Sequence, residues 1–249
     1  MRFFFLIILV NSFLSSCTSG SHEELFFNDV IESASKSSIS GYVNLYDEGT
    51  FPMEDKSGMQ IKIEELSSFS ATTDKNGYFT LKDVPFGTYT LIYEKTGYGT
   101  YKKYQHKHYT SSTFITHSPS LGKKSTTQIN NITAKVEGDF IALSFTTNYI
   151  GAENNKFYYI RYFLSSSPSV SDSFYSYYSP TLMIQKHNNA LILTKSDLLN
   201  RGFHSGEKLY IKIYGDSYFS NVYDDPFLGK KIFPNLNRIS FADSYFIVP

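Results

Sequence analysis

The stretch that decides the fold is TDKNGYFTLKDVPFGTYTLIYEKTGYGTY, Thr73 to Tyr101. It contains two turn signals. Asn76 and Gly77 tolerate the positive φ that a tight hairpin turn requires and that ordinary residues resist. Pro85 fixes one backbone angle and Gly87 frees another before the next strand opens. The stretch therefore predicts short strands that are separated by tight turns.

Apolar and polar residues alternate with a period of two around these turns. Such alternation places one face of a strand on a core and the other face toward solvent. Short strands that are broken by turn signals predict an all-β sandwich. The pattern occurs in Ile39 to Tyr46, Met59 to Glu64 and Tyr89 to Glu94.

ISGYV at Ile39 to Val43, taken together with the stretch above and its spacing, resembles the carboxypeptidase regulatory-like, or transthyretin-like, domain. The resemblance covers about Ile39 to Tyr104. It implies a small, non-catalytic, seven-stranded sandwich of a kind attached to enzymes, outer-membrane transporters and many surface lipoproteins. We assign this domain to residues 38–122. The resemblance predicts the fold and the kind of protein that carries the domain, and it says less about activity.

A second sandwich is expected over residues 123–249, because a segment rich in Ser, Thr and Lys precedes Lys123 and about seven short strand-like segments follow it. LTKSDLLNRGFHSGEKLYIKIYG, Leu193 to Gly215, resembles the corner between strands E and F of fibronectin III and immunoglobulin-like domains. The resemblance implies that Leu198 and Leu199 plug the bottom of the core. The absence of Trp and of a cysteine pair favours the fibronectin side.

The composition excludes several classes of protein. The 249 residues suffice for two domains, and 23 basic residues balance 23 acidic ones without a basic stripe, so nucleic acid is not an expected partner. The single cysteine cannot form an intramolecular disulfide, and it cannot build a zinc site on two or more thiolates. The cysteine must therefore form an intermolecular bond, carry a covalent modification, or have no specific role.

The N-terminus has the layout of a secretory signal peptide. Arg2 precedes the apolar run Phe3 to Val10, which is too short for a permanent membrane anchor. Leu14, Ser15, Ser16 and Cys17 resemble the bacterial lipobox. The resemblance implies cleavage after residue 16 and acylation of Cys17, for example with palmitate. The acyl chains would replace a transmembrane helix as the anchor, because several chains hold a protein to a membrane far better than one. A secretory peptide that is cut elsewhere is the alternative.

Residues 17–37 would then form a short tether between the lipid and the first sandwich. Its acidic pair, Glu23 and Glu24, is similar to the short acidic stretches that mark surface lipoproteins of some diderm bacteria. The expected location is the outer membrane, with the protein lipid-anchored at the cell surface. The periplasmic face is the alternative.

The sequence contains none of the nucleophile, zinc-helix, phosphate-loop or dinucleotide motifs, so we predict no enzyme activity, no cofactor and no metal site. His106 and His108 would face one side of a strand, where they could bind a divalent metal with His117 as a third ligand. The alternative is a pair of exposed histidines on an edge strand.

Tyr175, Tyr177 and Tyr178 lie in SFYSYYSP, a segment that is expected to form a loop or an edge strand. Tyrosine presents a flat apolar face with a polar tip, which suits stacking on a sugar ring or contact with a protein. The alternative is that these rings face the core. We name the three tyrosines as candidate ligand-binding residues.

The leading hypothesis is a non-catalytic outer-membrane or cell-surface lipoprotein that acts as a binding or scaffold module. One alternative is an accessory that captures glycan or peptide for an outer-membrane importer. Another is a component of a surface appendage or adhesin, whose last strand, Ser244 to Pro249, pairs with the edge of a partner. The expected partners are the membrane and either an outer-membrane protein or a glycan.

Overall fold

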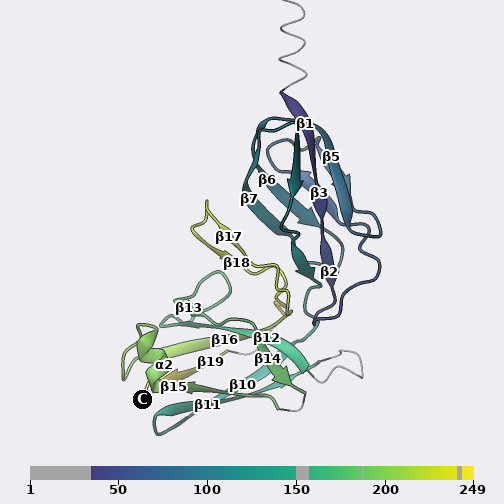
Figure 1. The fold of residues 1–249 in the computed structure, drawn as a ribbon. Helices are drawn as coiled ribbons and strands as arrows, with labels where there is room; N and C mark the ends of the chain where they lie inside the picture. Colours follow the sequence, from purple (N-terminus) through teal and green to yellow (C-terminus); the bar gives the residue numbers. More distant parts are fainter. Residues whose placement is uncertain (1–34, 150–156, 187, 240–242) are drawn as a thin grey trace, which may run out of the picture.

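The computed structural model of the protein describes residues 35–149, 157–186, 188–239 and 243–249. Nearly all of the regular structure is β, and Figure 1 shows two sets of packed sheets that are joined by a narrow junction. The prediction of an all-β fold is confirmed.

The first sandwich packs two sheets on a core of buried apolar residues that runs from Ile39 to Leu121. One sheet has the order β5-β1-β8, the other has the order β4-β3-β6-β7, and β2 and β9 form a short parallel pair. The strands are β1 (Lys36–Tyr42), β2 (Asn44–Tyr46), β3 (Gln60–Ile63), β4 (Ser70–Thr72), β5 (Tyr78–Pro85), β6 (Gly87–Glu94), β7 (Tyr101–His108), β8 (Ser112–Ile115) and β9 (Ser120–Gly122).

The two turns predicted from Thr73 to Tyr101 cross between these sheets. Gly77 adopts φ 85°, and the Asp74 side chain accepts hydrogen bonds from the backbone N–H groups of Asn76 and Tyr78. However, β4 pairs with β3 whereas β5 pairs with β1, so the turn at Gly77 is not a hairpin. The turn residues favour a tight reversal, but the pairing of each strand depends on contacts that are distant in the sequence.

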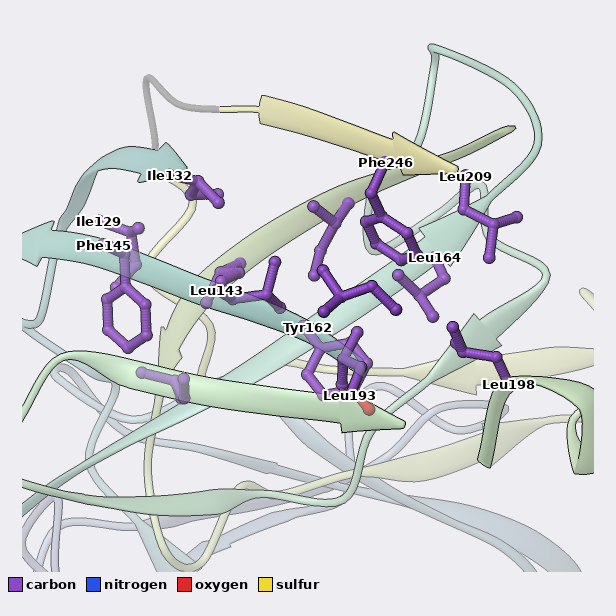
Figure 2. Packing of buried hydrophobic residues seen from close by; sticks show 14 of the residues in the cluster. Ile129, Ile132, Leu143, Phe145, Tyr162, Leu164, Leu193, Leu198, Leu209 and Phe246 are labelled. Carbon is purple, nitrogen blue, oxygen red and sulfur yellow. The ribbon is translucent and has the colours of Figure 1, made fainter. Parts of the chain in front are cut away.

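The second sandwich also packs two sheets, with the orders β10-β11-β15 and β13-β12-β16-β19, and β14 pairs with β12. Figure 2 shows the apolar side chains between them. The elements are β10 (Ile129–Glu137), β11 (Phe140–Thr147), β12 (Phe157–Ser165), β13 (Tyr177–Tyr178), β14 (Leu182–Gln185), β15 (Ala190–Thr194), α2 (Lys195–Asn200), β16 (Lys208–Asp216), β17 (Tyr223–Asp225), β18 (Lys230–Ile232) and β19 (Asp243–Ile247).

Two expectations about this sandwich change with the structure. Leu198 is fully buried, but Leu199 is 42% exposed, because neighbouring positions on the short helix α2 point about 100° apart. The C-terminal strand β19 pairs with β16 of its own chain, where Tyr210 lies opposite Tyr245. It is therefore an ordinary member of the sheet, and only its outer edge is left for pairing with a partner.

The five-stranded sheet of the second sandwich is covered on both faces. Its inner face contributes to the main core, whereas Phe163 and Tyr214 on its outer face pack against Val170, Phe233 and Leu236. This second cluster, which we call the outer cluster, explains why the last residues of β12 are buried without alternation. A covering layer of non-sheet chain is therefore part of the fold.

The two sandwiches meet at a buried asparagine. The Asn235 side-chain amide donates to the carbonyl oxygens of Gly122 at 2.9 Å and Phe219 at 2.8 Å. Its oxygen accepts from the Gly99 backbone at 2.9 Å and from the Asn221 side chain at 3.1 Å. All four hydrogen-bonding positions of the amide are thus filled, and Asn235 is fully buried.

Close approach of the backbone supports this junction. A Cβ atom on Gly99 would lie 2.4 Å from the Asn235 oxygen, so no larger residue fits there without movement. Asn221 adopts φ 55° and donates to the carbonyl oxygens of Gly99 and Gly122. The Phe219 ring stacks on Tyr46 with 3.9 Å between centroids. Residues of both sandwiches therefore share one polar and aromatic contact region.

A hairpin from the second sandwich adds a further contact. Strands β17 and β18 form this bridging hairpin, residues 223–232, which extends toward the first sandwich in Figure 1. Tyr104 on β7 donates its hydroxyl hydrogen to Asp225 at 3.0 Å. The Tyr223 ring lies edge-on to Tyr101, and Phe227 lies edge-on to Tyr104. The hairpin thus lies beside the edge strand β7.

Replacing Asn235 with alanine should lower the free energy of unfolding by about 2 to 4 kcal/mol, because it leaves the buried Gly99 N–H without its partner and removes one of the two hydrogen bonds to each of the Gly122 and Phe219 carbonyls. Urea denaturation of the full chain measures this change. Asn148→Ala, at an exposed asparagine, is the matched control and should stay within about 0.5 kcal/mol of the parent. Equal stability of the two variants would contradict the role given to Asn235.

Candidate functional site

A shallow depression of about 450 Å³ lies between the segment that carries the predicted tyrosines and the bridging hairpin. Its volume is within the range of small-molecule sites. The lining residues come from two segments that are roughly 50 positions apart in the sequence: Ser173, Tyr175, Tyr178, Asp224, Gly229, Lys230 and Lys231. We call this feature the hairpin depression.

Two of the predicted tyrosines line the hairpin depression and are anchored in the outer cluster. Tyr175 and Tyr178 lie edge-to-face with 5.4 Å between ring centroids, and each also packs against Phe233. Both side chains are half-buried, so part of each stays accessible. Burial raises the pKa of Tyr175 above that of a free tyrosine.

Charged side chains form the other wall. The Lys231 ammonium group lies 2.7 and 2.8 Å from the two carboxylate oxygens of Asp224, and this hydrogen bond raises the pKa of Lys231. Lys230 donates to the carbonyl oxygen of Ser173 at 3.3 Å. The depression therefore offers aromatic surface, hydroxyl groups, a carboxylate and two ammonium groups within one small area.

A buried ion pair holds the tyrosine segment in place. Arg161 on β12 donates to Asp216 on β16 at 2.9 Å, and both side chains are almost completely buried. The same guanidinium group donates to the carbonyl oxygen of Ser179 and, at 2.6 Å, to the Thr181 hydroxyl. Burial raises the pKa of Asp216, and the charge of Arg161 opposes this change. Arg161 thus fixes the chain that follows Tyr178.

The third predicted tyrosine lies elsewhere. Tyr177 packs against Tyr162, 6.0 Å between centroids, and the Arg201 guanidinium lies 4.4 Å from its ring centre. It contacts the main core of the second sandwich and does not line the depression. Sequence reasoning named all three tyrosines, and it missed Asp224 and Lys230, because nothing in the pattern places the bridging hairpin beside them.

The two histidines on β7 are buried, so the interpretation as exposed edge histidines is wrong. His108 contacts the Thr113 hydroxyl through Nδ1 at 2.7 Å, and the Val84 carbonyl through Nε2 at 3.2 Å. It therefore links β7 to the opposite sheet. The Nε2 atom of His106 has no hydrogen-bond partner, and its pKa is lowered to about 4 by burial and by the nearby charges of Lys103 and His108.

Two negative findings concern only the residues that the structure describes. Among them, no three side chains of the His, Cys, Asp and Glu type are grouped so that they could hold a metal ion. No helix in those ranges is long and apolar enough to cross a membrane. Cys17 and the lipobox residues Leu14, Ser15 and Ser16 lie outside the described ranges.

No family model and no curated protein matches the sequence. Among solved structures, the chain is similar to part of a type II cohesin–X-dockerin complex from Acetivibrio cellulolyticus, with 32% identity and a TM-score of 0.28. That match covers 32% of this chain and 51%, about half, of the other chain.

Two further solved structures match over more of the chain. A candidate carbohydrate-binding protein from Bacteroides uniformis is 14% identical, with a TM-score of 0.30, over 84% of this chain and 98% of the other. A DUF3823 family protein from Parabacteroides merdae is 13% identical, with a TM-score of 0.27, over 81% and 96%. Likeness at these TM-scores carries no property over to this chain.

The buried His106 should make stability depend on pH. In the unfolded chain this histidine binds a proton near pH 6.5, but in the folded protein only near pH 4, so stability is lost as the pH falls between these values. The loss attributable to His106 is at most about 3 kcal/mol. Urea denaturation at several pH values should show a flatter profile for His106→Leu than for the parent.

His117→Leu, at an exposed histidine, is the control and should keep the parent profile. Identical pH profiles for His106→Leu and the parent would contradict the account of this buried ring.

Proposed function

We propose that the protein is a non-catalytic binding module that captures a glycan at the hairpin depression. The observation that carries this proposal is the joint lining by Tyr175 and Tyr178 on one wall and by Asp224, Lys230 and Lys231 on the other. Aromatic faces stack on the apolar faces of sugar rings, whereas carboxylate and ammonium groups exchange hydrogen bonds with sugar hydroxyls. Both kinds of group are present within one accessible site.

The construction of the site supports binding without large rearrangement. Tyr175 and Tyr178 rest on Phe233 in the outer cluster, and Arg161 fixes the chain that follows them. The opposite wall is the bridging hairpin, which also contacts the first sandwich through Tyr104 and Asp225. Preorganised groups lose less conformational entropy when a ligand binds. The junction between the sandwiches thus helps to position one wall of the site.

The setting that we propose is a lipid anchor on Cys17, with cleavage of the preceding 16 residues and with the residues between Cys17 and the start of β1 at Lys36 as the tether. The lipobox at Leu14 to Cys17 supports it, as does the position of the only cysteine at the end of a signal-peptide pattern. On this proposal the protein works at the outer membrane as a lipoprotein. A transthyretin-like sandwich followed by a fibronectin III or immunoglobulin-like sandwich would present the site away from the lipid.

Changes in the hairpin depression should weaken glycan binding. A printed array of oligosaccharides, probed with the full chain in mild detergent, identifies a bound sugar. The double change Tyr175→Ala with Tyr178→Ala should then weaken binding roughly a hundredfold, because both stacking surfaces are lost. Lys230→Ala, a change at the rim, should weaken binding roughly tenfold and leave the fold intact.

Phe174→Ala is the matched control, since this exposed ring of the same segment does not line the depression and should leave affinity unchanged. Circular dichroism checks folding of every variant. The absence of any array signal, or binding that survives both the double change and Lys230→Ala, would refute glycan capture at this site.

Replacing Cys17 with alanine should abolish acylation, because the chain has no other thiol. Labelling of a diderm bacterial host with radioactive palmitate, followed by isolation of the protein, measures the anchor. Cys17→Ala should lose the label and leave the membrane fraction, whereas Ser19→Ala, two positions further along, should keep both. Label that survives Cys17→Ala would refute the proposed anchor.

A further inference from the structure

Three aromatic side chains lie exposed together on the first sandwich, far along the chain from the hairpin depression. Tyr42 on β1 is 41% exposed, Tyr78 on β5 is 37% exposed, and Phe114 on β8 is 53% exposed. These strands are the three neighbours of the sheet β5-β1-β8. We call the surface that they form the aromatic face.

The three rings touch one another in a row across the sheet. Tyr42 lies directly opposite Tyr78 in the antiparallel register, and their ring centroids are 5.1 Å apart. The Tyr42 and Phe114 centroids are 6.1 Å apart. The Tyr42 ring is tilted by 54° to the Tyr78 ring and by 71° to the Phe114 ring, so the three rings form an uneven surface. Such a surface suits a flexible polymer chain better than the flat face of a crystalline polymer.

The backbone under these rings is held by the core. Ile39 and Phe79, each on a strand that also carries one of the rings, are buried to 0% and 2% exposure, and Ile115 next to Phe114 is 3% exposed. The aromatic face therefore rests on a fixed sheet, and its rings stay exposed although the opposite side of the same strands is fully packed. Adjacent exposed rings of this kind are less common than single ones and indicate a contact surface.

The polar groups beside the rings are hydroxyls. Ser40 on β1 and Thr80 on β5 are half-buried between the aromatic positions. The Thr80 hydroxyl donates to the Tyr78 hydroxyl at 3.0 Å, so the Tyr78 hydrogen remains available to a ligand. A charged group stands at one end of the row, because the carboxylate of the exposed Asp74 accepts from the backbone N–H of Tyr78 at 2.9 Å.

We infer that the aromatic face binds an uncharged polysaccharide chain. Exposed rings supply stacking surfaces for the apolar faces of sugars, and serine, threonine and tyrosine hydroxyls exchange hydrogen bonds with sugar hydroxyls. A face of rings and hydroxyl groups with a carboxylate at its edge matches a neutral, polyhydroxylated ligand better than an anionic one, which that carboxylate would repel. This site is separate from the hairpin depression and does not depend on glycan capture there.

The chain contains no tryptophan, so Phe114→Trp introduces a unique fluorescent reporter into the aromatic face. The probes are dextran, soluble starch, galactomannan and xyloglucan, with alginate as the anionic comparison. The emission of the indole should shift with at least one neutral polysaccharide and not with alginate. The larger ring should also tighten binding relative to the parent in gel electrophoresis through the same polysaccharide.

Loss of the rings should remove the binding. In the gel that contains the polysaccharide, Tyr42→Ser combined with Phe114→Ser should abolish the retardation of the protein. This result corresponds to at least a tenfold loss of affinity. Phe51→Ser, at a single exposed ring elsewhere on the first sandwich, should keep it. The double change at Tyr175 and Tyr178 should keep it too, which separates this inference from the proposed function.

Several results would overturn the inference. They are no response to any of the four neutral polysaccharides, retardation that survives the loss of Tyr42 and Phe114, and an equal response to alginate. Sedimentation equilibrium provides a further check. A dimer that dissociates when Tyr42 and Phe114 are replaced would show that the aromatic face is an interface between two copies of the chain.

Discussion

The junction between the two sandwiches is centred on one fully satisfied buried amide. Asn235 fills all four of its hydrogen-bonding positions with groups from both sides of the junction: Gly99, Gly122, Phe219 and Asn221. A buried polar network of this kind stabilises one arrangement strongly, because any other arrangement leaves backbone groups without partners. The glycine at position 99 is part of the same constraint, since a Cβ there would collide with the amide.

The position of the hairpin depression follows from this junction and from the outer cluster. The bridging hairpin leaves the second sandwich and lies beside β7, where Asp225 accepts from Tyr104. The same hairpin supplies Asp224 and Lys230 to the wall of the depression. A change in the angle between the sandwiches would therefore move one wall of the site relative to Tyr175 and Tyr178. On the proposed function, ligand binding at the depression and the packing between the sandwiches would be coupled through this hairpin.

Aromatic residues serve two different purposes in this chain. Phe163 and Phe233 are buried in the outer cluster, where their rings lie edge-to-face with 5.1 Å between centroids. Tyr42 and Phe114 remain exposed on a sheet whose other face is completely packed. The composition alone does not separate these roles, because the same residue types occur in both sets. Burial and neighbouring rings distinguish a packing aromatic from one that is available to a ligand.

The sequence by itself determined the all-β class and the tight turn at Gly77, because alternation and positive φ are local properties of the chain. It also named Tyr175 and Tyr178, but it could not separate them from Tyr177 or find Lys230. Only the tertiary structure decided that the predicted hairpin turn crosses between sheets, that His106 is buried and that Leu199 is exposed. These outcomes depend on which strands pair and which faces meet, and residues that are distant in the sequence make those contacts.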